Sequence, residues 1–121
     1  MLTVLVADDE FAVLEVLSMA LESEGLVVLK AGDGADALRV LSSHHCDLII
    51  VDEAMPVMDG LQLIEAVRAE PRYAHIRIIM MADTWGRATP ELDGVVVLGK
   101  PILLAELFAR VGELAASAGK G

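Results

Sequence analysis

The sequence predicts an α/β fold in which parallel strands alternate with helices. Short apolar runs of strand length are followed along the chain by longer segments with the period of an amphipathic helix. These apolar runs do not alternate with polar residues, which is typical of strands covered on both faces by helices. Two of the runs end in acidic residues and a third leads to a lysine. Because ligands of open α/β sheets bind beyond the carboxyl ends of the strands, these charged residues mark the predicted site.

The elements can be placed in order from their periodicity and their end signals. We predict strands at 2–7, 26–30, 48–51, 76–81 and 95–98, and helices at 11–23, 34–42, 61–69 and 103–116. Gly25 follows the first helix, Asp33 can cap the second, and Asp59-Gly60 opens the third. A core-facing stripe marks the last helix at Leu104, Leu107, Phe108, Val111 and Leu114. Residues 83–94 hold two glycines and a proline without apolar period, so we expect a loop with at most one or two helical turns.

Length and composition indicate one domain with an aliphatic core. The chain has 121 residues, 55% of them hydrophobic and 3% aromatic. We assign residues 1–117 to the domain and 118–121 to a disordered tail. No apolar run approaches the roughly 18 residues of a membrane span, and the chain does not open with a basic leader, so we expect a cytoplasmic protein. The single cysteine, Cys46, cannot form an internal disulfide and is predicted to be a buried thiol.

The net charge of the chain argues against nucleic acid as its partner. Nine Lys and Arg stand against nineteen Asp and Glu, which gives a formal charge of −10. Nucleic-acid binding needs a clustered positive surface, so this chain alone is not expected to bind nucleic acid. The expected partner is a cation or a protein.

The charged strand ends predict a metal site. Asp8 and Asp9 follow the first strand, Asp52 ends the third, and Lys100 follows the last. These side chains converge if the strands are parallel neighbours, and the repulsion among three carboxylates is relieved by a cation. Magnesium prefers carboxylate, carbonyl and water oxygens. We predict Asp9 and Asp52 as direct ligands, Asp8 as a ligand through water, and the backbone carbonyl of Ala54 as a further ligand.

The same residues suit phosphoryl transfer. Asp52 can attack phosphorus while magnesium and the Lys100 ammonium neutralise the phosphoryl oxygens. Simpler interpretations exist for each part: the run Asp8-Asp9-Glu10 could decorate a helix N-terminus, and Lys100 could be a surface charge before a proline turn. The combination of the three strand ends favours the phosphoryl site.

The full set of motifs resembles the receiver domain of two-component response regulators, of the chemotaxis-regulator kind. The motifs are Asp8-Asp9-Glu10, Asp52 within the stretch Val51-Asp52-Glu53-Ala54-Met55-Pro56-Val57-Met58-Asp59-Gly60, and Lys100-Pro101. The resemblance implies a flavodoxin-like, doubly wound five-stranded parallel sheet in the order 2-1-3-4-5, flanked by five helices. It also implies that Asp52 accepts phosphate from a histidine kinase or phosphotransfer protein, that Asp8 and Asp9 hold magnesium, and that Lys100 contacts the phosphoryl group. The Lys100-Pro101 bond would be cis.

The chain departs from the family pattern where a receiver usually switches conformation. Family members usually carry Ser or Thr at the end of the fourth strand, and that position is Ala82 here. The next residue is Asp83, which could repel a phosphoryl group or add a metal ligand, and Thr84 is a candidate substitute donor. The usual aromatic switch residue in the fifth strand is Val97. The segment between Ala82 and Lys100 is several residues short, so we expect a shortened or missing fourth helix.

Several functions fit these residues. The leading hypothesis is a stand-alone receiver, not an enzyme, that is phosphorylated on Asp52 and signals to a downstream effector through protein contacts. If the chain is part of a longer protein, an attached output domain takes that role. The alternative is a receiver-like docking domain that acts without phosphorylation, which Ala82, Asp83 and Val97 favour. A magnesium-dependent phosphatase would commonly carry an acid at Ala54, and in a flavin-binding relative the phosphate would meet Asp8 and Asp9; both are disfavoured.

Two further features lie outside this site. His44-His45 precede the third strand without nearby acids, so we expect them to be solvated and not to bind metal. Trp85 lies in the irregular segment and could anchor a partner or fold back over the core.

Overall fold

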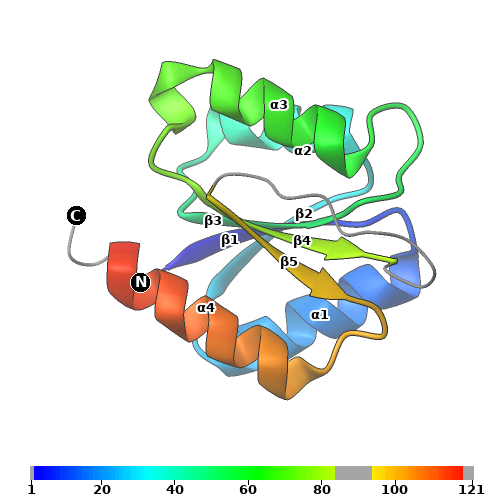
Figure 1. Ribbon diagram of the computed structural model, residues 1–121, viewed down its shortest axis with the longest axis vertical. Helices are drawn as coiled ribbons and strands as arrows, with labels where there is room; N and C mark the ends of the chain where they lie inside the picture. The colour runs from blue at the N-terminus through cyan, green and yellow to red at the C-terminus, as the bar shows by residue number, and fades with distance from the viewer. Residues whose placement is uncertain (1, 84–93, 119–121) are drawn as a thin grey trace.

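The computed structural model describes residues 2–83 and 94–118. Five parallel strands form one sheet in the order β2-β1-β3-β4-β5, which confirms the predicted topology (Figure 1). The elements are β1 (Thr3–Ala7), α1 (Phe11–Ser23), β2 (Val27–Ala31), α2 (Gly34–Ser43), β3 (Leu48–Asp52), α3 (Gly60–Ala69), the short 3₁₀ helix η1 (Pro71–Tyr73), β4 (Arg77–Ala82), β5 (Val95–Gly99) and α4 (Leu104–Ala118).

Helices cover both faces of the sheet. Helices α2 and α3 lie on one face, and α1 and α4 lie on the other (Figure 1). Each central strand therefore sends alternate side chains into two separate cores. In β3, Ile49 and Val51 pack on the α2–α3 side, whereas Leu48 and Ile50 pack on the α1–α4 side. All five residues of β3 are buried, which explains why its sequence shows no alternation of apolar and polar residues.

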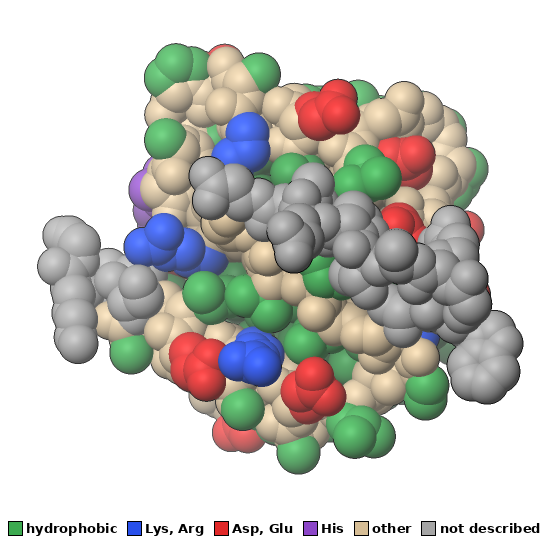
Figure 2. All heavy atoms as spheres, viewed as in Figure 1, with side chains coloured by type: hydrophobic (Ala, Val, Ile, Leu, Met, Phe, Trp, Pro, Cys, Tyr) green, Lys and Arg blue, Asp and Glu red, His purple; other side chains and the backbone are tan. Residues whose placement is uncertain are grey.

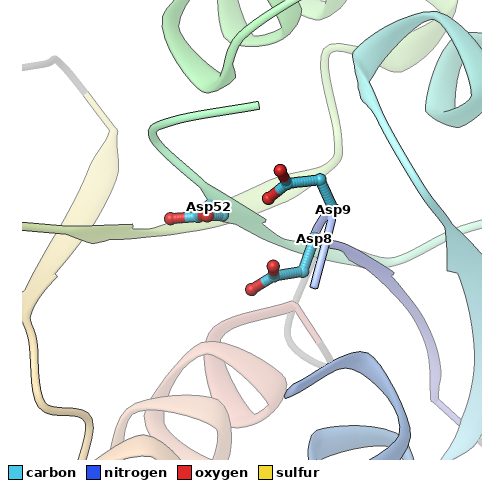
Figure 3. Close-up of side chains that lie close together, drawn as sticks. All are labelled: Asp8, Asp9 and Asp52. Carbon is cyan, nitrogen blue, oxygen red and sulfur yellow. The ribbon is translucent and has the colours of Figure 1, made fainter. Parts of the chain in front are cut away.

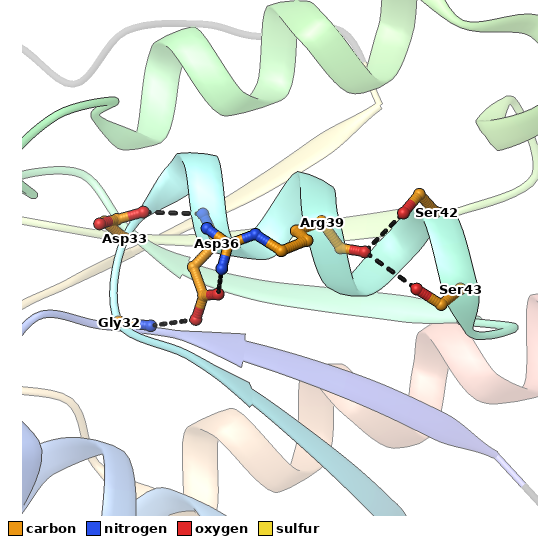
Figure 4. A network of polar contacts seen from close by, with 6 residues as sticks. All are labelled: Gly32, Asp33, Asp36, Arg39, Ser42 and Ser43. Atoms are coloured by element: carbon orange, nitrogen blue, oxygen red, sulfur yellow. Dashed lines mark hydrogen bonds and ion pairs between the residues drawn. The ribbon is translucent and has the colours of Figure 1, made fainter.

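The predicted helix end signals are present. The Asp33 side chain accepts a hydrogen bond from the backbone N–H of Asp36, and Asp59 forms a capping box with Gln62 at the start of α3. Gly25 follows α1 with a left-handed φ of 86°. Figure 4 shows the wider network around α2, in which Asp36 also contacts the Gly32 N–H and Arg39, while Ser42 and Ser43 donate to the Arg39 carbonyl. This network fixes both ends of α2.

Asp47 forms hydrogen bonds that connect β1, β3 and β4 at their amino-terminal ends. Its carboxylate accepts a hydrogen bond from the Thr3 N–H at 2.9 Å, and its own N–H donates to the Thr3 carbonyl at 2.9 Å. The Asp47 carbonyl accepts from the Arg77 N–H at 3.1 Å. The neighbouring Cys46 is buried, as predicted, and burial raises the pKa of its thiol to about 11.

Several predictions fall on residues 84–93 or at the chain end. The structure does not describe the residues on which three predictions fall: the length of the fourth helix, the substitute role of Thr84 and the position of Trp85. The tail after Ala118 also lies outside the described residues. Within residues 2–83 and 94–118, no helix is long and apolar enough to cross a bilayer. On the face shown in Figure 2, the described Lys and Arg side chains are scattered and do not gather in one patch.

Candidate phosphoryl and metal site

The sheet places the predicted residues at one edge. Asp8 follows β1, Asp52 ends β3 and Lys100 follows β5. Backbone hydrogen bonds continue past the strand ends: the Asp8 N–H donates to the Ala31 carbonyl at 3.1 Å, and the Lys100 N–H donates to the Ala82 carbonyl at 2.9 Å. The backbone at these positions is therefore held by the sheet and not by a long loop.

Three carboxylates meet at this edge. Oxygens of Asp8, Asp9 and Asp52 all lie within 4.8 Å of one another, and the side chains approach from the ends of β1 and β3 (Figure 3). Asp8 and Asp52 are buried, whereas Asp9 is exposed. An all-oxygen donor set with one side open to water fits magnesium. In the part of the chain that the structure describes, this is the one such group of three or more ligands, so it does not include Asp83.

Burial and mutual repulsion act on Asp8. Desolvation raises its pKa, and the hydrogen bond that its carboxylate accepts from the Glu10 N–H at 2.9 Å opposes this rise. The negative charges of Asp52 and Asp9 raise the pKa further, while Lys100 lowers it, and the net shift is upward. A bound cation would therefore favour the ionised cluster.

Lys100 is the counter-charge of Asp52. Its Nζ lies 2.6 Å from Asp52 Oδ1. Partial burial lowers the pKa of Lys100, but the contact with Asp52 and the charge of Asp8 outweigh that effect and leave the pKa above its ordinary value. Lys100 therefore remains an ammonium at neutral pH, directed at the predicted phosphoryl acceptor. The Lys100-Pro101 bond is cis, as the resemblance implied.

The loop after Asp52 closes tightly against the strand end. A Cβ at Gly60 would lie 2.5 Å from the Asp52 carbonyl oxygen, so only glycine fits there. The Gly60 N–H donates to the Glu53 carbonyl at 2.9 Å. Ala54 is exposed and lines, together with Asp9, an open hollow of about 650 Å³. The predicted carbonyl ligand therefore belongs to the loop that borders the carboxylates.

Sequence reasoning missed two features of this loop. Val57 has a left-handed φ of 69°, which is unfavourable for a β-branched residue. Gly34, at the start of α2, approaches the loop so closely that a Cβ would lie 2.6 Å from the Met58 carbonyl oxygen. The Met-Pro and Asp-Gly pairs indicate a turn here, but neither pair indicates which residue takes the left-handed conformation or which helix the loop touches.

A second hollow adjoins the carboxylate site at Asp8 and Lys100, whereas the first adjoins it at Asp9 and Ala54. It measures about 420 Å³ and lies between α1 and the segment joining β5 to α4. Asp8 and Lys100 line it, and the rest of its wall is largely apolar, including Val13, Val16 and Ile102. Exposed hydrophobic side chains lie on α1, at Phe11, Val16 and Met19, and around the start of α4, at Leu103 and Leu104, so the expectation that Leu104 faces the core is wrong. This apolar region could not be predicted from either segment alone.

The two positions at which the resemblance implies switch residues lie in β4 and β5. Ala82 is the last residue of β4, is buried and pairs with Gly99. Val97 pairs with Met80 and packs, half-buried, against the α2–α3 core. Ala82 therefore brings no hydroxyl to the end of β4, and Val97 brings no aromatic ring to β5.

Comparison with known proteins agrees with this fold. A family model for the response regulator receiver domain matches residues 4–112. The chain is 36% identical over 113 residues to the transcriptional regulatory protein PrrA of Mycobacterium tuberculosis, covering 92% of this chain and 48% of PrrA. It is 34% identical over 113 residues to the response regulator MprA of Mycobacterium ulcerans, covering 92% and 49%. The chain thus spans about half the length of these relatives.

Solved structures show the same architecture. The chemotaxis protein CheY4 of Vibrio cholerae superposes with a TM-score of 0.84 at 29% identity, covering 94% of this chain and 98% of that chain. The receiver domain of the Francisella response regulator 1452 gives a TM-score of 0.81 at 26% identity, covering 94% and 96%. From the sheet order, the charged strand ends and these matches, we conclude that the chain belongs to the family of response regulator receiver domains.

Proposed function

We propose that this receiver accepts a phosphoryl group on Asp52 from a histidine kinase or phosphotransfer protein, in the cytoplasm, and signals through protein contacts. The observation that carries the proposal is the 2.6 Å contact between Lys100 Nζ and the buried Asp52 carboxylate, beside Asp8 and Asp9. Asp8, Asp9, Asp52 and the Ala54 carbonyl would hold magnesium. We expect a signalling role and no enzymatic turnover.

The chemistry requires little rearrangement of the chain. An Asp52 oxygen forms a bond to phosphorus as the bond between phosphorus and the donor imidazole nitrogen breaks, and the imidazole then takes up a proton. Bound magnesium would supply positive charge to the phosphoryl oxygens. Lys100, released from its contact with the Asp52 oxygen, can pair with a phosphoryl oxygen instead.

Apolar surface beside the site supports a protein donor. The hollow between α1 and the start of α4 has Asp8 and Lys100 on its wall, and the exposed side chains Phe11, at the start of α1, and Leu103, just before α4, belong to the chain segments that border it. Exposed hydrophobic side chains that gather at one place favour protein contacts. A partner seated there would lie beside Asp52.

Phosphorylation is tested by incubating the protein with acetyl phosphate and magnesium and measuring its intact mass. We expect the wild-type chain to gain one phosphoryl group and Asp52→Asn to gain none, since an amide is a poor nucleophile. Lys100→Ala should keep the carboxylate but react more slowly. Phosphate on the Asp52→Asn protein would overturn the assignment of the acceptor.

The altered switch favours a second candidate, a docking domain that acts without phosphorylation. Ala82 is buried at the end of β4 and has no hydroxyl to bond a phosphoryl oxygen, and a ligand shifts two states only through differential interactions. We expect beryllofluoride to change amide NMR shifts at residues 95–98 less in the wild type than in Ala82→Thr or Asp83→Ala. Equal responses in all three proteins would show that another group performs the switch.

A further inference from the structure

Helix α2 supplies no carboxylate to the cluster, but its first residue touches the loop that borders the cluster. Gly34 is buried, and its N–H donates a hydrogen bond to the Met58 carbonyl at 3.1 Å. A Cβ at Gly34 would lie 2.6 Å from that carbonyl oxygen, 2.7 Å from Met58 Cγ and 2.8 Å from Met58 Cβ. A flexible side chain could turn away from a new methyl group, whereas a backbone carbonyl moves only with its loop. The glycine at this position therefore determines how closely α2 and the loop approach each other.

The loop between β3 and α3 has little freedom to absorb a displacement at Met58. The Gly60 N–H donates to the Glu53 carbonyl at 2.9 Å, which closes the loop into a hydrogen-bonded ring. Inside this ring, the Met58 N–H donates to the Pro56 carbonyl at 2.7 Å around Val57, whose φ is 69°. A γ-turn with a left-handed central residue is a rare and strained form. Because the ring is short and closed, a shift of Met58 is passed on to the other residues of the ring.

Ala54 belongs to the same ring. It lines the open hollow of about 650 Å³ together with Asp9. The loop is also anchored to the core between the sheet and helices α2 and α3, because Met55 is buried there and Met58 packs against the same cluster. The position of the Ala54 carbonyl thus depends on the contact between Met58 and Gly34, although Gly34 lies outside the site.

We propose that Gly34 is a positioning residue for the magnesium site, acting through Met58 to hold the loop where the Ala54 carbonyl can serve as a ligand. The inference rests on the proposed function, which assigns that carbonyl to magnesium, and it adds a residue from an element that supplies no ligand. A methyl group at position 34 would displace the loop but leave the three carboxylates in place, because they come from the ends of β1 and β3. Magnesium would then lose one protein ligand and keep the others.

Gly32 supplies a matched control. It lies between β2 and α2, two residues before Gly34, and it is exposed. A Cβ at Gly32 would meet no heavy atom within 4 Å. Neither glycine has a left-handed φ, so alanine fits the backbone conformation of both. Gly32→Ala and Gly34→Ala therefore add the same methyl group, one into open space and one against the loop.

The experiment is a magnesium titration of the full chain, followed by NMR through the amide nitrogen shift of Met55, whose nitrogen shares a peptide group with the Ala54 carbonyl. We expect Gly34→Ala to bind magnesium about tenfold more weakly than the wild type, as when a supporting partner of a metal ligand is removed. Gly32→Ala should bind like the wild type. The shift change of Met55 at saturation should also be smaller in Gly34→Ala, which a loss of stability alone would not produce.

A second variant covers the case in which the new methyl group unfolds the domain. Met58→Ala removes the Cγ beside Gly34, so the double variant Gly34→Ala/Met58→Ala has more room for the new Cβ but still meets the Met58 carbonyl. All titrations are made in sucrose, which favours the folded state. The double variant should bind magnesium more weakly than Met58→Ala alone, and equal binding by these two proteins would overturn the role of Gly34.

The wild-type titration separates failure of this inference from failure of the proposed function. A wild-type chain that does not bind magnesium would overturn the proposed metal site, and the role of Gly34 with it. If the wild type binds magnesium and Gly34→Ala binds equally well, or if Gly32→Ala is weakened to the same extent, the metal site stands and the role of Gly34 is overturned.

Discussion

Val57 has an unfavourable backbone conformation, and its side chain gains too little packing energy to offset the cost. Its φ of 69° lies in the left-handed region, where a side chain with a Cβ costs about 1–2 kcal/mol. The side chain is 83% exposed, so it gains little from packing. Val57 lies in the loop between β3 and α3, whose end at Gly60 packs against the Asp52 carbonyl. The loop after Asp52, the proposed phosphoryl acceptor, therefore stores strain at one residue.

Replacing Val57 by Asn should stabilise the domain. Asparagine tolerates the left-handed region better than a β-branched residue, so we expect the free energy of unfolding to rise by about 1 kcal/mol. Urea denaturation measures this change. Val57→Thr is the control, because threonine keeps the branching at Cβ and should give no such gain. Equal stabilities of the Asn and Thr variants would show that backbone strain is not the cause.

At the scale of elements, Asp47 joins the beginnings of β1, β3 and β4. Its carboxylate accepts from the Thr3 N–H, and its backbone continues the pairing of β3 toward both neighbouring strands. The hydrogen bonds from Thr3 and His45 leave the pKa of Asp47 below its ordinary value despite partial burial. A carboxyl group whose pKa is lower in the folded state stabilises that state above the unfolded pKa, and this contribution fades as the pH falls.

Asp47→Asn should therefore destabilise the domain in a pH-dependent way. Near pH 7 we expect a loss of about 1 kcal/mol, because hydrogen bonds to a charged acceptor become bonds to a neutral one. The difference from the wild type should shrink as the pH falls below about 4, the unfolded pKa of Asp. Denaturation at a series of pH values measures the difference. A loss that stays constant down to pH 3 would contradict the role of the charge.

Across the whole molecule, the sheet gathers repelling charge at a single edge. Asp8, Asp9 and Asp52 come from two strands, and Lys100 from a third supplies positive charge against them. A cation bound only by the folded state shifts the folding equilibrium by mass action. The stability of the entire domain is thus expected to report on this site.

Magnesium should raise the melting temperature of the wild-type protein. At ten times its Kd, a ligand stabilises the folded state by about 1.4 kcal/mol. Asp9→Asn should remove most of the effect, since Asp9 is the exposed member of the cluster and its substitution leaves the buried core unchanged. Thermal melts with and without millimolar magnesium test this. A wild-type melting temperature that does not change with magnesium would argue against a formed metal site.

The fold and the convergence of the charged strand ends could be predicted because both follow from local patterns. Strands and helices were visible as apolar runs and helical periods, and Asp8, Asp52 and Lys100 lie at or near the ends of such runs, so parallel pairing alone brings them together. The strain at Val57 depends on loop closure, which no local pattern encodes. The expectation that His45 has no acid nearby is wrong, since its Nε2 lies 2.8 Å from Asp47 Oδ1, and Asp47, two residues along the chain, was a signal that could have been read.

The burial of Cys46 has a practical consequence. It is the single cysteine of the chain, it is 2% exposed, and the pKa of its thiol is raised to about 11. Thiol reagents attack the thiolate, so the folded domain should resist labelling until the start of β3 opens. At reagent concentrations low enough that the segment recloses faster than it is labelled, the labelling rate divided by that of an unstructured peptide gives the equilibrium constant for this opening. The natural chain thus contains a kinetic reporter of local unfolding at the start of β3.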